Sequence, residues 1–262
     1  MPQFERNGVK LSFTDTGNVD KPAVIFSHGF LMDGSMFAPN IEALSDDFRC
    51  ITWDQRGFGK TGTVHQPFDF WDSAADLLGL LDHLEIASAA LVGMSQGGFL
   101  SMRAALLEPA RFRAICLIST RSGVDAQPVI DSFNHLKKTW LEHGASPVAE
   151  NLRALLIGDD FDATRWVNAW REMPRAGFEF PVDALTGRDD ITGRLAEITC
   201  SAIVFHGARD PAIDIEHGRS LANGLPNLKG FVTVENAGHA PCLTHPQFVN
   251  RPLEDFLLRY TA

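Results

Sequence analysis

Ser95, Asp210 and His239 are the residues whose types and order could perform nucleophilic catalysis. A serine hydroxyl is a weak nucleophile near neutral pH, so it needs a histidine to take its proton and an acid to orient that histidine. Ser95 stands in Gly-Met-Ser-Gln-Gly at 93–97, where small residues on either side let a strand and a helix meet around a strained serine. The three residues predict a serine hydrolase.

Each of these three residues lies just beyond an apolar run that is typical of a strand. The runs at 89–93, 201–206 and 229–234 lack apolar–polar alternation, as expected for strands covered by helices on both faces. Catalytic groups of parallel sheets collect beyond the carboxyl ends of the strands. We therefore expect the serine, the acid and the histidine to converge at one edge of a sheet.

Other residues compete for the roles of acid and base. Asp210 precedes Pro211 and could merely cap a helix, while Asp214 and Asp125 are weaker rival acids. Three further histidines have simpler interpretations, His206 as a structural residue at a strand end and His217 and His245 as surface or helix-start residues. The order Ser, Asp, His favours Asp210 and His239.

Two backbone amides are candidates for the oxyanion hole that acyl transfer requires. The Gln96 amide follows the nucleophile at a helix N-terminus, whose dipole favours negative charge. A second donor is expected from the loop after the strand at 23–27, where Gly29 allows a tight path and Phe30 supplies the amide. We interpret His28 in the same loop as structural.

The remaining elements predict an α/β fold with a doubly wound, mostly parallel eight-stranded sheet flanked by helices. Asn7-Gly8 favours a two-residue hairpin turn between the first two strands. Between the later strands, apolar residues recur at the spacing of one face of a helix, which indicates helices. A helix that joins two parallel strands of one sheet implies a right-handed crossover. The eight expected strands are 4–6, 9–14, 23–27, 49–53, 89–93, 114–119, 201–206 and 229–234.

Residues 121–197, after the sixth strand, contain no convincing strand. They predict four short helices at 129–142, 147–156, 163–172 and 182–185. We therefore expect one domain over 1–262, with a core at 1–120 and 198–262 and a helical lid at about 121–197.

The lid is rich in aromatic side chains, which could form its own small core or line an apolar pocket. Sequence leaves both interpretations open. The candidate pocket residues are Met94, Phe133, Trp140, Trp166 and Trp170.

Together these motifs resemble the α/β-hydrolase fold, and more narrowly its bacterial esterase, lactonase and carbon–carbon hydrolase members. The resemblance covers essentially the whole chain. It is carried by the segments 27–30 (SHGF), 54–59 (DQRGFG), 93–98 (GMSQGG), 207–210 (GARD) and 238–239 (GH). It implies Ser95 as nucleophile, His239 as base and Asp210 as orienting acid, with the Phe30 and Gln96 amides as the oxyanion hole.

Two relatives within that fold are excluded by chemistry, and one feature departs from the family. Haloalkane dehalogenases and epoxide hydrolases place a carboxylate where this chain has Ser95, and epoxide opening uses lid tyrosines, whereas the one tyrosine here is Tyr260. Pro252 falls where the family has a continuous final helix. It should kink that helix or postpone its start to about Arg251.

Composition restricts the class of partner. The chain has 262 residues, is 45% hydrophobic and carries a net charge of −10, which argues against nucleic-acid and membrane partners. The four cysteines are widely spaced, with no zinc-like cluster. We expect a cytoplasmic enzyme with a small-molecule substrate and with no cofactor or metal; its oligomeric state stays open.

The leading prediction is a hydrolase that cleaves the ester of a small, largely apolar substrate through an acyl-enzyme. Lactone opening (of an enol-lactone or an acyl-homoserine lactone), carbon–carbon hydrolysis and cofactor-free perhydrolysis would use the same triad. A small-molecule receptor with this fold is the alternative from outside the enzymes. Arg121 and Ser122 could bind a substrate carboxylate, although such residues more often face solvent.

Overall fold

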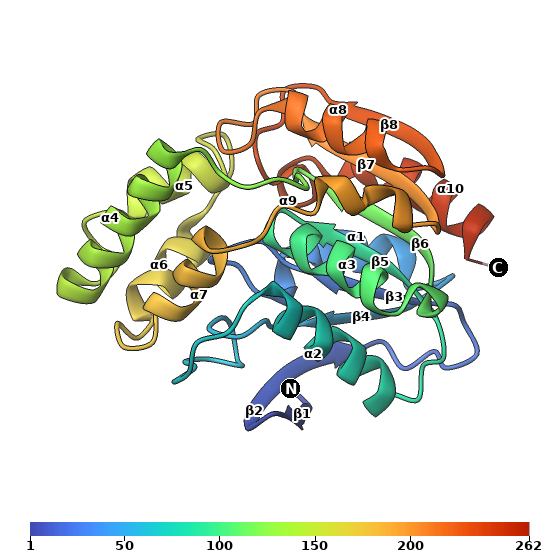
Figure 1. Ribbon diagram of the computed structural model, residues 1–262, viewed down its shortest axis with the longest axis horizontal. Helices are drawn as coiled ribbons and strands as arrows, with labels where there is room; N and C mark the ends of the chain where they lie inside the picture. Colours follow the sequence, from blue (N-terminus) through green and yellow to red (C-terminus); the bar gives the residue numbers. More distant parts are fainter. Residues whose placement is uncertain (262) are drawn as a thin grey trace.

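The computed structural model, which describes residues 1–261, is built on an eight-stranded sheet of order β1-β2-β4-β3-β5-β6-β7-β8 (Figure 1). The first two strands form the predicted hairpin, with Asn7 at φ 50° and Gly8 at φ 75° in its turn. β2 pairs antiparallel with β4, and all later pairings are parallel. The strands are β1 (Gln3–Arg6), β2 (Val9–Asp15), β3 (Ala23–Ser27), β4 (Arg49–Trp53), β5 (Ala89–Met94), β6 (Phe112–Ile118), β7 (Ser201–Gly207) and β8 (Leu228–Val234).

The strands are buried as their apolar sequences predict. Every residue of β3, β4 and β5 is buried, because helices cover both faces of the sheet centre. β8 is an edge strand, and most of its residues are only half-buried. The predicted fold class is confirmed, with strand ends that differ from expectation by one or two residues.

Helices pack on the two faces of the sheet (Figure 1). α2 and α3 contact each other on one face, while α1 and α10 contact each other on the other. α2 begins with a capping box in which the side chains of Asp69 and Asp72 accept each other's backbone amides. The helices of the core are α1 (Ala38–Leu44), α2 (Phe70–His83), α3 (Gln96–Leu107), α8 (Ile215–Gly224), α9 (Pro241–Thr244) and α10 (Pro246–Tyr260), with 3₁₀ turns η1 (Gly34–Phe37), η2 (Pro109–Arg111) and η3 (Thr192–Glu197).

Pro252 does not delay the last helix, contrary to one of the two outcomes expected for it. α10 begins at Pro246 and continues through Pro252 to Tyr260. A proline at the first helical position is pre-organised for the helix and has no amide to lose. At Pro252 the packing of Val249, Leu253 and Phe256 against the core holds the helix together across the missing hydrogen bond.

The segment between β6 and β7 forms four α-helices, as predicted. They are α4 (Gln127–His143), α5 (Ala149–Leu156), α6 (Thr164–Glu172) and α7 (Glu179–Thr186). Figure 1 shows these helices, coloured from green through yellow to golden orange, gathered to one side of the sheet. α4 packs on α7 and α5 packs on α6, so the segment has packing of its own.

The two ends of this helical segment are bonded to each other. The Ile191 amide donates to the Ser122 carbonyl at 3.2 Å, and the hydroxyls of Ser122 and Thr192 lie 2.9 Å apart. Arg188 donates to the Gly123 carbonyl at 3.2 and 3.3 Å. The chain therefore leaves the sheet and returns to it at one place.

In residues 1–261, no helix combines the length and the hydropathy of a membrane span. The cysteine thiols are free, and burial raises the pKa of Cys50 and of Cys242 to about 12.

Candidate active site

Ser95 lies in the sharp turn between β5 and α3, with φ 51° and ψ −115°. This conformation is unfavourable for any residue with a Cβ. The turn is possible because the flanking residues are glycines. A Cβ on Gly97 would overlap the Ser27 carbonyl oxygen, and one on Gly93 would lie 2.5 Å from the Gly97 oxygen.

The structure brings the three predicted side chains together. The Ser95 Oγ lies 3.0 Å from His239 Nε2, and His239 Nδ1 lies 3.0 and 2.9 Å from the two carboxylate oxygens of Asp210. All three residues are largely buried. This arrangement lets the imidazole accept the hydroxyl proton while its other nitrogen donates to the acid.

The loops that carry the acid and the base touch through their backbones. Asp210 follows β7 and His239 follows β8, which are paired along their length. Gly207 lies where they meet, and a Cβ there would overlap the carbonyl oxygen of Gly238. The absence of a side chain at Gly207 thus allows the acid to approach the imidazole.

Asp210 is buried, and it is surrounded by donors. Its Oδ1 accepts the amides of Ala212 and Ile213 at 2.9 and 3.0 Å, and its Oδ2 lies 3.3 Å from His206 Nε2. Burial alone would raise the pKa of Asp210. The positive charge that His239 can carry and these hydrogen bonds outweigh burial and hold the pKa of this carboxyl well below its usual range.

Neither rival acid lies against the imidazole of His239. Asp125 is held by Arg121 and Arg188, with 2.6 Å between Arg188 Nη1 and Asp125 Oδ2. Asp214 caps α8 by accepting the Glu216 amide at 2.8 Å. Of the three candidate acids, Asp210 is the one that the fold places on His239.

The Gln96 amide is oriented by the carbonyl of its own peptide. The Ser95 carbonyl accepts the amides of Gly98 and Phe99 and, at 2.8 Å, the Thr120 hydroxyl. In a trans peptide the N–H points opposite to the C=O. The Gln96 N–H therefore points away from α3, and as the first residue of a helix it has no acceptor within that helix.

The Phe30 amide is fixed in the same way. The carbonyl of its peptide, that of Gly29, accepts from His28 Nδ1 at 2.8 Å and from the Met32 amide at 3.1 Å. His28 Nε2 in turn accepts the Gln55 amide at 2.9 Å. A histidine that donates at one nitrogen and accepts at the other is neutral, and burial lowers the pKa of His28.

A buried chain of amides, which the sequence did not predict, connects the two candidate donors. The Gln96 side chain donates to Gln55 Oε1 at 2.7 Å, and Gln55 Nε2 donates to the His28 carbonyl at 2.6 Å. Gln55 belongs to the segment 54–59, one of those that carry the family resemblance. The one sequence signal for this chain of amides was a glutamine in each of two such segments, at 55 and 96.

A cavity of about 420 Å³ opens above Ser95 and His239. Its walls come mainly from α4 and α5 and from the loop after β7, and they are largely apolar. The apolar lining residues include Phe30, Val129, Phe133, Leu136, Val148, Leu152, Leu155, Leu156, Leu185, Pro211, Ala212 and Ile213.

Phe133 is the one predicted pocket residue that lines this cavity; the interpretation of the other four as pocket residues is corrected. Trp140 stacks on Phe178 with ring centroids 4.1 Å apart, inside the helical segment. Trp170 donates from Nε1 to the Leu31 carbonyl at 2.6 Å, and so attaches α6 to the core. Trp166 and Met94 are buried and are not part of the cavity wall.

Arg121 and Ser122 do not face solvent, which corrects the simpler interpretation of both. They are 8% and 7% exposed. Arg121 forms an ion pair with Asp125 and donates toward His217 Nε2 at 3.3 Å. Its positive charge is therefore balanced by a carboxylate of the protein itself. Arg121 and Asp125 form a polar patch on the cavity wall.

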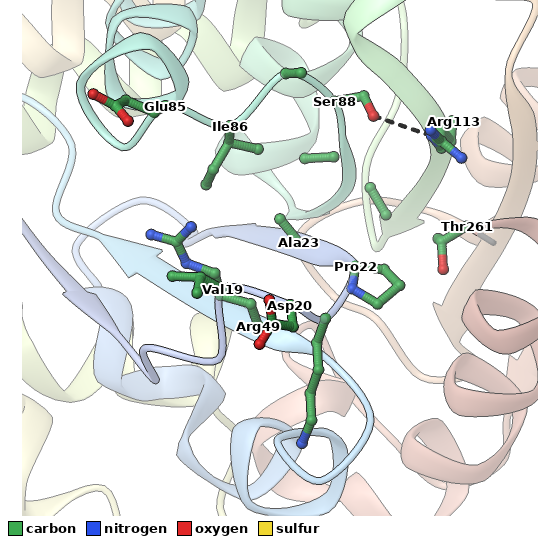
Figure 2. Close-up of a pocket in the computed structure, with 14 residues that line it drawn as sticks. Val19, Asp20, Pro22, Ala23, Arg49, Glu85, Ile86, Ser88, Arg113 and Thr261 are labelled. Carbon is green, nitrogen blue, oxygen red and sulfur yellow. Dashed lines mark hydrogen bonds between the residues drawn. The ribbon is translucent and has the colours of Figure 1, made fainter.

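A second cavity, of about 400 Å³, lies at the opposite ends of the strands from Ser95 (Figure 2). Ala23, Arg49 and Ala89, at the amino ends of β3, β4 and β5, line it. Two of its charged side chains are bonded within the protein: Arg49 to Asp15 at 2.7 Å and Arg113 to Ser88 at 3.0 Å. None of the predicted site residues lies there.

Comparisons with known proteins agree with this architecture. A family model described as the alpha/beta hydrolase fold matches residues 22–246. The 3-oxoadipate enol-lactonase 2 of Acinetobacter baylyi is 25% identical, over 96% of this chain and 94% of that protein.

Solved structures are similar over nearly the full chain. A thermophilic esterase from Thermogutta terrifontis, solved with malate bound, superposes with a TM-score of 0.86 at 26% identity, covering 99% of this chain and 97% of that one. The enol-lactonase from Burkholderia xenovorans has a TM-score of 0.89 at 24% identity, covering 98% and 100%, and shows the likeness of fold alone. This chain belongs to the alpha/beta hydrolase fold family.

Proposed function

We propose that this protein hydrolyses carboxylic esters through an acyl-enzyme on Ser95. The observation that carries the proposal is the 3.0 Å contact between Ser95 Oγ and His239 Nε2, with Asp210 on the far nitrogen of the ring. A nucleophile, a base and an orienting acid in hydrogen-bonded series are what ester cleavage at neutral pH needs.

In the proposed first half-reaction, His239 Nε2 takes the Ser95 proton as Oγ attacks the ester carbonyl carbon. The carbonyl oxygen becomes an oxyanion, and the Phe30 and Gln96 amides stabilise it with two hydrogen bonds. The C–O bond to the alcohol then breaks, and the imidazolium returns its proton to the leaving oxygen. Asp210 stays ionised and stabilises the imidazolium.

In the second half-reaction, water replaces the alcohol. His239 takes one proton of the water, whose oxygen attacks the acyl carbon of the ester formed on Ser95. Collapse of the second oxyanion breaks the bond to Oγ, and the imidazolium protonates Oγ. The products are one acid and one alcohol, and the enzyme is unchanged.

We further propose that the segment 121–197 acts as a lid that selects substrates. α4 and α5 contribute most of the apolar wall, including Phe133 and Leu152. Such a wall favours a neutral, aliphatic or aromatic substituent, because each buried CH₂ contributes about 0.8 kcal/mol. Esters of small hydrophilic acids should be the poorest substrates in a panel.

Lactone opening is the second candidate, and the similarity to the 3-oxoadipate enol-lactonase 2 of Acinetobacter baylyi favours it. A lactone is a cyclic ester, so the same groups would perform the same steps, with the alcohol remaining attached to the product.

The test is a comparison of wild type with Ser95→Ala. We expect a fluorophosphonate probe to label wild-type Ser95, and short p-nitrophenyl esters to be turned over. Ser95→Ala should lose labelling, and its kcat should fall by about 10⁴–10⁶-fold while the fold is retained. Labelling without turnover of any ester or lactone would favour a receptor, and near-normal turnover by the variant would refute the proposal.

A further inference from the structure

We propose that His206 is a positioning residue that fixes Asp210 for its role against His239; this inference rests on the proposed function. His206 is wholly buried on β7, one residue before Gly207. Its Nε2 lies 2.8 Å from the Ile213 carbonyl and 3.3 Å from Asp210 Oδ2.

The contacts of His206 determine its tautomer. The Ile213 carbonyl can only accept, so Nε2 must carry the proton. Within residues 1–261, Nδ1 has no hydrogen-bond partner and is fully buried. A second proton there would create a buried, unsolvated N–H on a cation, which is costly. The ring is therefore neutral, with its single N–H donated to the Ile213 carbonyl and with Nε2 3.3 Å from Asp210 Oδ2.

This N–H closes the turn that carries the acid. Asp210 Oδ1 accepts the amides of Ala212 and Ile213 within the turn. His206, from the strand, holds both the carboxylate and the carbonyl of Ile213 at the end of the turn. The carboxylate is thus fixed on two sides, and Oδ2 is held toward His239 Nδ1.

The neighbouring helix makes room for this ring. A Cβ on Gly218, in α8, would overlap His206 Nδ1. A glycine within a helix makes that helix less stable than alanine would. Gly218 lies against His206 in spite of this, which is consistent with a ring held in a defined place.

Replacing His206 by asparagine or by glutamine provides a matched test, because the two amide nitrogens lie near different ring nitrogens of the original histidine. The amide of His206→Gln reaches approximately the Nε2 position, and that of His206→Asn only the Nδ1 position. We expect kcat of His206→Asn to fall about 10-fold with KM nearly unchanged, and His206→Gln to recover most of the loss. Rates are referred to active sites titrated with a fluorophosphonate.

A purely structural His206 would lower the melting temperature of both variants and leave kcat per titrated site equal in the two; that result would overturn the inference. The wild type supplies a second measurement that needs no variant to fold. Nitrogen NMR of the histidine-labelled protein should show His206 as the neutral Nε2–H tautomer, and an Nδ1–H tautomer would also overturn it. If the wild type hydrolyses no ester, that result contradicts the proposed function, whereas the results named above contradict the role of His206.

Discussion

At the scale of single residues, the backbone of Ser95 is strained. Its φ of 51° with ψ of −115° is tolerated only because β5 and α3 hold it from both sides. Such conformations cost about 1–3 kcal/mol each. The hydroxyl is therefore presented to the cavity at the expense of stability.

Replacing Ser95 by glycine should make this cost measurable. Ser95→Gly and Ser95→Ala both remove the hydroxyl, so both should be inactive. Glycine relieves the strain but loses about 0.4–1 kcal/mol to the entropy of the unfolded chain. We expect Ser95→Gly to be about 1 kcal/mol more stable than Ser95→Ala in urea unfolding. Equal stability would show that the turn is unstrained.

Asp210 gives a prediction about stability and pH. Because its pKa is lowered in the folded protein, it contributes stability that is fully present above its unfolded pKa, about 3.9. That contribution is lost as the pH falls through the folded pKa. The free energy of unfolding of wild type should decline more steeply below about pH 4 than that of Asp210→Asn. Parallel declines in chemical unfolding from pH 6 to 3 would contradict this.

At the scale of elements, the close approach of α3 to β3 sets the site. The glycines at 93 and 97 allow the helix to begin against the backbone of a neighbouring strand. This same approach brings the Gln96 amide near the loop that carries Phe30. The packing of α3 and the position of the proposed oxyanion hole are therefore consequences of one contact.

Gly97→Ala should disrupt both. The added methyl would overlap the Ser27 carbonyl, which is backbone and cannot rotate away, so α3 must shift. We expect a loss of about 3 kcal/mol in stability together with most of the proposed esterase activity. Gly193→Ala, where nothing lies within 4 Å of the added Cβ, is the control and should behave as wild type. Full activity of Gly97→Ala would refute the tight-turn explanation.

Local sequence predicted the elements far better than the contacts between them. Strands such as 49–53 and helices such as 163–172 were correct to within a residue or two, because apolar spacing and breaking residues are local signals. Sequence could not decide whether Trp140 and Trp170 line the pocket or pack inside the protein, because the face of a helix that meets the core depends on tertiary packing. The Gln55–Gln96 bond joins residues 41 positions apart, and no local pattern indicates it.

At the scale of the whole molecule, the base of the helical segment is held by buried charge. Asp125 accepts from Arg121 at the start of the segment and from Arg188 at its end. Arg103, from α3, adds an ion pair to Asp189 at 2.6 Å. The two pairs that Asp125 makes are buried and depend on both partners, because a single unpaired charge is expensive.

Asp125→Asn should therefore be strongly destabilising. It leaves two buried guanidinium groups without their shared carboxylate, at a cost of roughly 3–5 kcal/mol. The control is Asp159→Asn, which breaks the exposed contact of Asp159 with Arg153 and should leave the unfolding midpoint unchanged. If thermal or urea unfolding gave the two variants the same midpoint, the network would not be holding the segment.

The two ends of the helical segment are hydrogen-bonded to each other, at residue 122 and residues 191–192, and this has a consequence for how the segment could vary in evolution. The segment leaves the sheet after β6 and returns before β7, and these two strands are paired with each other. The helices between them therefore do not have to bridge any fixed distance. The helices of this segment could therefore be replaced by those of another family member while Ser95, Asp210 and His239 keep their positions.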